Sequence, residues 1–100
     1  MANFNDVING SENVLVDFYA AWCGPCKTLG PILEEVKNDM GDRLRIVKVD
    51  VDKNQQLAAQ MGVRGVPSLF FYQKGKLIKS ASGVLAKHEI KNVFGFWRVF

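Results

Sequence analysis

The sequence has few cysteines and histidines, and this scarcity excludes several kinds of site. Its 100 residues include two cysteines, Cys23 and Cys26, and one histidine, His88. A closed zinc site needs about four such ligands, so a metal site would require two copies that share their cysteine pairs. A structural disulfide framework uses more cysteines and closes longer loops. We expect no metal, a solvated His88 without a role, and a cysteine pair that serves chemistry.

Long apolar runs and clusters of one charge are also missing. No stretch of about 18 apolar residues could span a membrane, and the first residues lack the basic and apolar regions of a secretory signal. The net charge is +3, from 13 basic and 10 acidic residues, and these are scattered. No run of Lys and Arg would follow a phosphate backbone. We expect a cytoplasmic protein that binds neither membrane nor nucleic acid.

The apolar residues that are present predict one α/β domain over residues 1–100. Their spacing predicts strands at 14–20, 44–51, 68–72 and 76–80, and helices near 4–8, 26–40, 54–61 and 85–97. The first strand is apolar on both faces except at Asp17, as is typical of a central strand covered by helices. Lys74-Gly75 indicates a hairpin turn. We expect a parallel core with an antiparallel edge added by that hairpin.

The sequence Cys23-Gly24-Pro25-Cys26 follows a buried strand and opens a helix. The unpaired N–H groups of a helix N-terminus favour a thiolate, which is the reactive form of cysteine. Cys26 lies one turn further on, so its sulfur can reach that of Cys23. We expect Cys23 to attack a substrate disulfide and Cys26 to resolve the mixed disulfide. Inert buried thiols are the alternative, although a Gly-Pro loop fills a core poorly.

Asp17 is the second candidate catalytic residue. Burial disfavours an ionised carboxyl, so the pKa of Asp17 should be raised. Such a group near the cysteine loop could exchange the proton of Cys26. The alternative is a structural salt bridge, with Lys48 on the neighbouring strand as its partner. Both hold if Lys48 tunes the pKa of Asp17.

Trp22 lies beside the reactive loop and is either a core aromatic or a substrate-facing one; we favour the second, because Trp often anchors interfaces. Lys27 is expected to be exposed and to keep the site electropositive. Pro67 fixes the entry of the following strand and removes one backbone donor there.

Several segments of the chain resemble the thioredoxin family. They are residues 14–27, which include the WCGPCK motif, residues 31–34, 48–52 and 62–68, and the pairs 74–75 and 82–83. The similarity runs from about Phe4 to Phe94. It implies a thioredoxin fold and a general protein disulfide reductase with a reversible Cys23–Cys26 disulfide.

The resemblance also implies roles for individual residues. Asp17 matches the family's buried acid and Lys48 its nearby lysine, and the Val66–Pro67 bond should be cis and pack against the cysteines. The backbone near Val66 should pair with an extended substrate segment. The family's apolar docking surface is matched by Trp22, Gly24, Pro25, Val51, Gly65, Val66, Pro67, Gly83 and Val84.

No bound cofactor is implied. The family is recharged by an NADPH-dependent flavoprotein, thioredoxin reductase. It passes electrons to ribonucleotide reductase, peroxiredoxins and methionine sulfoxide reductases, and so serves electron transport and cell redox homeostasis. A monomer is expected.

Three departures from the family pattern stand out. The usual leading strand is missing, which predicts four strands rather than five, four helices, and an edge strand at 44–51. Ala86 replaces a helix-capping Ser or Thr, at a cost of about 1 kcal/mol. The tail 94–100 is unusually aromatic, and Gly95 breaks its helix. The tail either packs on the sheet or forms a surface for a partner.

Two other functions stay open on the sequence alone. A disulfide oxidase or isomerase would favour His between the cysteines, where this chain has Gly24 and Pro25. An interaction module would hold a partner at the edge strand or tail. Such a module would keep binding its partner after both cysteines were replaced by Ser, whereas a reductase would lose all activity.

Overall fold

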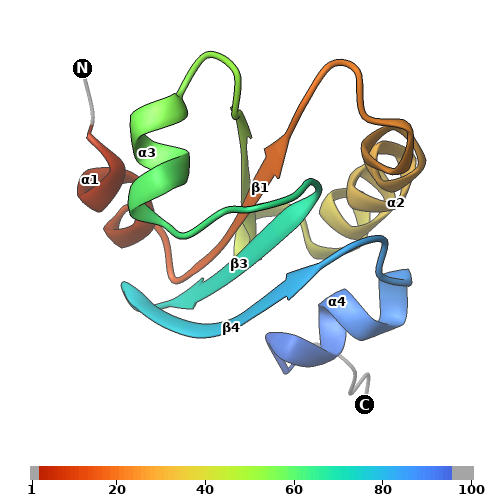
Figure 1. The fold of residues 1–100 in the computed structure, drawn as a ribbon. Helices are drawn as coiled ribbons and strands as arrows, with labels where there is room; N and C mark the ends of the chain where they lie inside the picture. The colour runs from red at the N-terminus through yellow and green to blue at the C-terminus, as the bar shows by residue number, and fades with distance from the viewer. Residues whose placement is uncertain (1–2, 96–100) are drawn as a thin grey trace.

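The computed structural model describes residues 3–95 and contains the predicted elements in the predicted order (Figure 1). The helices are α1 (Phe4–Asn9), α2 (Gly24–Met40), α3 (Gln55–Gln60) and α4 (Lys87–Val93), with a 3-10 turn η1 (Gly41–Arg43) after α2. The strands are β1 (Asn13–Tyr19), β2 (Arg45–Asp50), β3 (Ser68–Gln73) and β4 (Lys76–Ser82). Within the described residues the sheet has four strands and no fifth, which confirms the four-strand prediction.

The strand order is β2-β1-β3-β4. β1 and β2 are parallel, whereas β3 is antiparallel to both β1 and β4. The prediction of a parallel core was therefore wrong beyond the β1–β2 pair. The reason lies in residues 61–67, which bring the chain back to the end of the sheet where β1 finishes, so that Ser68 at the start of β3 pairs with Phe18. β2 is an edge strand, as predicted.

Helices cover both faces of the sheet, α1 and α3 one face and α2 and α4 the other (Figure 1). Successive β1 side chains alternate between the faces, so Leu15 packs under α2 while Val16 and Phe18 pack under α1 and α3. This is why residues 14–19 of β1 are apolar on both faces except at Asp17. No helix among residues 3–95 is both long and apolar enough to cross a membrane.

The ends of α4 differ from the prediction. The helix stops at Val93, and Gly95 has a φ of +82° that suits glycine. Phe94 is buried, with its ring centroid 5.3 Å from that of Phe71. Ala86 is the N-cap and offers no side-chain acceptor, as predicted, although its N–H donates to Glu89 Oε1 at 2.9 Å. Residues 96–100, including the predicted helical Trp97, lie outside the described residues, so both predictions for the tail stay untested.

A polar clamp of Asn13, Gln73 and the Phe94 carbonyl joins the sheet to the end of α4. Asn13 is 4% exposed, and its Nδ2 donates to the Arg43 carbonyl at 2.9 Å. Gln73 Nε2 donates to Asn13 Oδ1 at 3.0 Å and to the Phe94 carbonyl at 3.1 Å. These bonds satisfy buried polar groups and fix the β1–β3 register at the end of the sheet away from the cysteines.

We expect Gly75→Ala to destabilise the protein by about 1–2 kcal/mol. Lys74 and Gly75 both have positive φ, at 51° and 80°, as a type I′ hairpin turn requires. A Cβ at Gly75 would also clash with the Asn9 amide. Urea unfolding measures the loss.

Gly30→Ala is the matched control for that substitution. Gly30 lies inside α2, and apart from its chain neighbours and the backbone of that helix nothing is within 4 Å of the position its Cβ would take. The added methyl should stabilise the helix by up to about 1 kcal/mol. Equal losses in both variants would show that the turn geometry at Gly75 is not the cause.

Candidate functional site

Cys23 and Cys26 form a disulfide at the N-terminus of α2. Cys23 is the N-cap residue, and its Sγ accepts a hydrogen bond from the Cys26 N–H at 3.1 Å. Pro25 lies in the first turn, where its missing N–H leaves no bond unmade. The local sequence thus places the first sulfur at the positive end of a 17-residue helix, where the helix dipole favours a thiolate after reduction.

The cysteine pair is mostly covered by its surroundings. Cys23 is 3% exposed and Cys26 8% exposed. Together with Ala20 they form a small cluster, against which Tyr19, Val51 and Val66 pack. Cys23 Sγ lies 3.7 Å from the Val66 carbonyl oxygen. Next to the buried pair, Trp22, Gly24 and Pro25 are all exposed.

Asp17 is a buried carboxyl in the middle of β1. It is 2% exposed, and within the described residues its Oδ1 has no hydrogen bond. Burial raises its pKa to about 6, and the charge of Lys48 opposes that rise. This agrees with the predicted direction. A carboxyl with this pKa is mostly ionised at pH 7, and its carboxylate accepts a proton more readily than an ordinary aspartate does.

Lys48 lies opposite Asp17 in the parallel β1–β2 register. Among residues 3–95 the two side chains form no ion pair, so the salt bridge considered from the sequence is not present. Lys48 Nζ instead lies over the Tyr19 ring, 5.1 Å from its centroid. Lys48 therefore acts on Asp17 as a nearby charge, not as a bonded partner.

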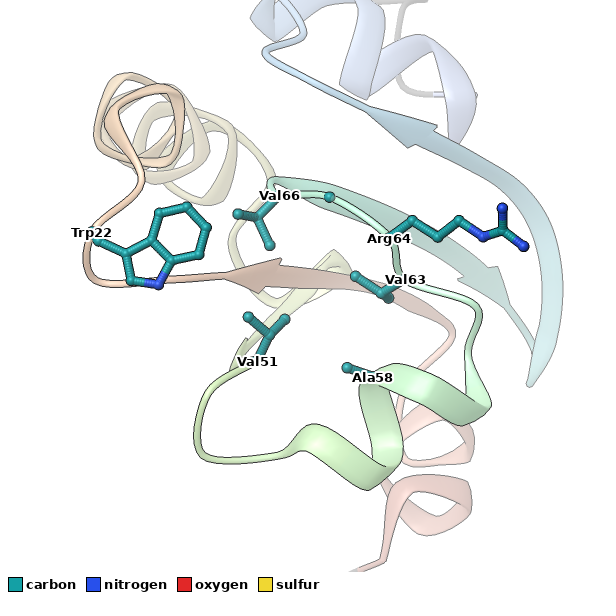
Figure 2. A pocket seen from close by; sticks show the side chains of 7 residues that line it. Trp22, Val51, Ala58, Val63, Arg64 and Val66 are labelled. Atoms are coloured by element: carbon teal, nitrogen blue, oxygen red, sulfur yellow. The ribbon is translucent and has the colours of Figure 1, made fainter.

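A shallow apolar cavity of about 140 Å³ opens beside the disulfide (Figure 2). It is lined by Trp22, Val51, Ala58, Val63, Arg64, Gly65 and Val66. Trp22 is 70% exposed, which rules out a core aromatic. Its indole N–H donates to Asp52 Oδ2 at 2.9 Å, which fixes the ring at the mouth of the cavity.

Four of the nine predicted docking residues line this cavity, namely Trp22, Val51, Gly65 and Val66, and the other five are not among its lining residues. The Val66–Pro67 bond is cis, as the resemblance implied. Pro67 itself is fully buried, and its carbonyl accepts the Gly83 N–H at 3.0 Å, so only Val66 of that pair lines the cavity. Val84 follows Gly83 and is 41% exposed.

Sequence reasoning missed several residues of the site. Ala58, Val63 and Arg64 line the cavity but were not predicted. Val63 and Arg64 directly precede Gly65, which was predicted as a docking residue, so their place in the chain was an available signal. Tyr19 was also missed, but its position two residues after Asp17 puts both side chains on the same face of β1. That alternation was the available signal. Lys27 and His88 are exposed, as expected.

Three comparisons place the chain among known proteins. The Thioredoxin family model matches residues 1–95. The chain is 45% identical over 85 residues to a thioredoxin of Acidithiobacillus ferridurans, covering 85% of this chain and 79% of that protein. It is 44% identical over 80 residues to a thioredoxin of Bacillus subtilis (strain 168), covering 80% and 77%.

Solved structures agree with the sequence comparisons. A mutant thioredoxin from Halobacterium salinarum NRC-1 superposes with a TM-score of 0.83 and 35% identity, covering 96% of this chain and 84% of that one. Oxidised mitochondrial thioredoxin 3 from Saccharomyces cerevisiae gives a TM-score of 0.82 with 32% identity, covering 91% and 85%.

Proposed function

We propose that this chain, which belongs to the thioredoxin family, is a general protein disulfide reductase in which Cys23 is the nucleophile, Cys26 the resolving thiol and Asp17 the proton acceptor. Family membership and the Cys23–Cys26 disulfide make it a thiol–disulfide oxidoreductase. The observation that carries the assignment of roles is the position of Cys23 as N-cap of α2, with Cys26 one turn inside.

The first step uses the reduced protein. The Cys23 thiolate attacks one sulfur of a substrate disulfide, the substrate S–S bond breaks, and the departing sulfur leaves as a thiolate that takes a proton from water. The Cys26 N–H, 3.1 Å from Cys23 Sγ in the disulfide, and the helix dipole both favour the attacking thiolate. Cys23 and the substrate are then joined by a mixed disulfide.

The second step releases the substrate. Asp17 takes the proton of the Cys26 thiol, and the resulting thiolate attacks Cys23 Sγ. The mixed disulfide breaks, the second substrate sulfur leaves as a thiolate, and the Cys23–Cys26 disulfide forms. Two electrons pass from the dithiol to the substrate. The raised pKa of Asp17, about 6, suits a base that must also return the proton in the reverse direction.

Substrate recognition is proposed to use the apolar surface around the cavity. Trp22, Val51 and Val66 offer apolar contact area beside the sulfurs. Val66 precedes β3, and an extended substrate segment could pair with its backbone as an added strand. Because this recognition uses backbone and apolar contacts, it fits many substrates with one accessible disulfide.

Membership of the family supports a proposal for the source and the destination of the electrons. We propose thioredoxin reductase, an NADPH-dependent flavoprotein, as the donor, with no cofactor bound to this chain. Ribonucleotide reductase, peroxiredoxins and methionine sulfoxide reductases are the proposed acceptors. A reductase needs a reducing compartment, so this direction of electron flow fits electron transport in the cytoplasm.

Reduction of insulin by dithiothreitol tests the proposal. The natural chain should accelerate insulin precipitation, because its dithiol turns over between the two reagents. The variant with both Cys23→Ser and Cys26→Ser should give the rate of dithiothreitol alone. Circular dichroism of both proteins checks folding. A folded natural chain without activity would overturn the reductase assignment and favour the interaction module.

A further inference from the structure

The ammonium group of Lys48 lies against an aromatic ring and not against a carboxylate. Its Nζ stands 5.1 Å from the centroid of Tyr19, within the range of a cation–π contact. Lys48 is otherwise exposed, and among residues 3–95 no ion pair or hydrogen bond holds its ammonium. A free lysine side chain samples many rotamers. The Tyr19 ring is therefore the group that localises this charge.

Tyr19 also lies beside the redox site. It follows Asp17 by two residues on β1, so both side chains lie on one face of the sheet, the face on which Lys48 pairs opposite Asp17. The same Tyr19 packs against the cluster of Ala20, Cys23 and Cys26. The Tyr19 side chain thus packs against the cysteine cluster and also holds the Lys48 ammonium. That ammonium is the charge that opposes the effect of burial on the pKa of Asp17.

We propose that Tyr19 is a positioning residue whose ring holds the Lys48 ammonium over the Asp17 face of the sheet. Held there, the charge acts on the buried carboxyl; released, it would move into water, which screens it. The inference rests on the proposed function, in which Asp17 exchanges a proton with Cys26. It adds that Tyr19, by holding Lys48, adjusts how tightly Asp17 binds the proton that it exchanges.

Lys48 is the only residue whose charge is identified as acting on Asp17 among the described residues, although other ionisable groups lie nearby. They are Asp50 on β2, and Cys26, Glu34 and Lys37 on α2. β3 places the uncharged Leu69 opposite Asp17. Asp50 accepts backbone N–H bonds from residues 52 and 53, and Lys37 donates to the carbonyls of Gly41 and Leu44. Glu34 lines a cavity together with Lys48, and the two form no ion pair among residues 3–95.

The test is the titration of Asp17 in the oxidised protein, where the disulfide removes the cysteines from the titration. Carboxyl carbon shifts of 13C-labelled aspartate follow Asp17 by NMR. Tyr19→Leu should raise the midpoint by ~0.5 pH units, because the freed ammonium stabilises the carboxylate less. Tyr19→Phe keeps a ring face and should leave the midpoint near that of the natural protein.

A double-substitution cycle separates positioning from packing. Lys48→Met should raise the midpoint more than Tyr19→Leu does, and adding Tyr19→Leu to Lys48→Met should change nothing further. If Tyr19→Leu shifts the midpoint equally in both backgrounds, or lowers it, the proposal is overturned. Tyr19→Met retains apolar bulk and replaces Tyr19→Leu if the latter fails to fold. Since no substrate is reduced here, a failed insulin assay and a failed titration remain distinguishable.

Discussion

Cys26→Ser is expected to turn the protein from a catalyst into a trap for its substrate. Cys23 can still attack a disulfide, but no second thiol is present to break the mixed disulfide. Insulin turnover should fall to the level of dithiothreitol alone. Incubation with an oxidised substrate protein should leave an adduct whose mass is the sum of the two chains. Mass spectrometry without reductant detects this adduct, and added dithiothreitol should release it.

Cys23→Ser is the matched control, since it removes the other sulfur of the same disulfide. It should form no adduct and show no turnover, because Cys26 is one turn inside α2 and lacks the N-cap position. Both cysteines are at least nine-tenths buried, so both serine variants leave the surface nearly unchanged. Adduct formation through Cys26 alone would reverse the assignment of nucleophile and resolving thiol.

Asp17→Asn should make the protein more stable and should slow its reaction with substrate. In the natural protein the pKa of Asp17 is raised from 3.8 to about 6 by burial, so the folded state holds this proton more tightly than the unfolded state does. Ionisation of Asp17 therefore lowers the free energy of unfolding. This loss is absent below about pH 4 and complete above about pH 6. Asparagine does not ionise, so the variant does not lose stability in this way. The variant should gain about 3 kcal/mol at pH 8 and little at pH 3.5.

Urea unfolding of the two oxidised proteins at both pH values measures this difference. Asp39→Asn is a control of opposite sign, because Lys87 and Lys91 hold the pKa of the exposed Asp39 carboxyl below its usual value. It should lose stability at pH 8. An Asp17→Asn gain that is the same at both pH values would show that ionisation is not the cause.

The kinetic effect of Asp17→Asn should appear in the second half of the reaction. The mixed disulfide should form at the natural rate, while its resolution slows roughly a hundredfold at neutral pH because Cys26 lacks its base. The deficit should shrink as the pH rises, since hydroxide then deprotonates Cys26. Stopped-flow measurement of substrate release from pre-formed mixed disulfide separates the two steps. Equal slowing of both steps would argue for a distorted site.

The sequence predicted the parts of this site that depend on local pattern. A strand that is apolar on both faces is covered on both sides, and this pattern alone indicated that Asp17 is buried. A CxxC between strand and helix placed Cys23 at a helix N-terminus. These inferences depend on residues that are neighbours in the chain.

The parts that it missed depend on the relative placement of distant segments. The direction of β3 is decided by where residues 61–67 lead the chain, not by the residues of β3. The contact of Lys48 with Tyr19 needs the β1–β2 register, and alternation alone does not fix a register between two strands that are both covered. The bond from Trp22 to Asp52 joins residues 30 positions apart and has no sequence signature.

The polar clamp of Asn13, Gln73 and the Phe94 carbonyl has a practical consequence for capturing partners. The β1–β3 ladder runs from Asn13–Gln73 at the clamp to Phe18–Ser68 near the cysteines, a span of roughly 17 Å. Gly95, next to the clamp, is thus at the far end of the ladder from Cys23. A tether to a solid support on that side would leave the cysteine face open to large proteins. A column of the Cys26→Ser chain attached there could retain its partners from a cell extract and release them with reductant.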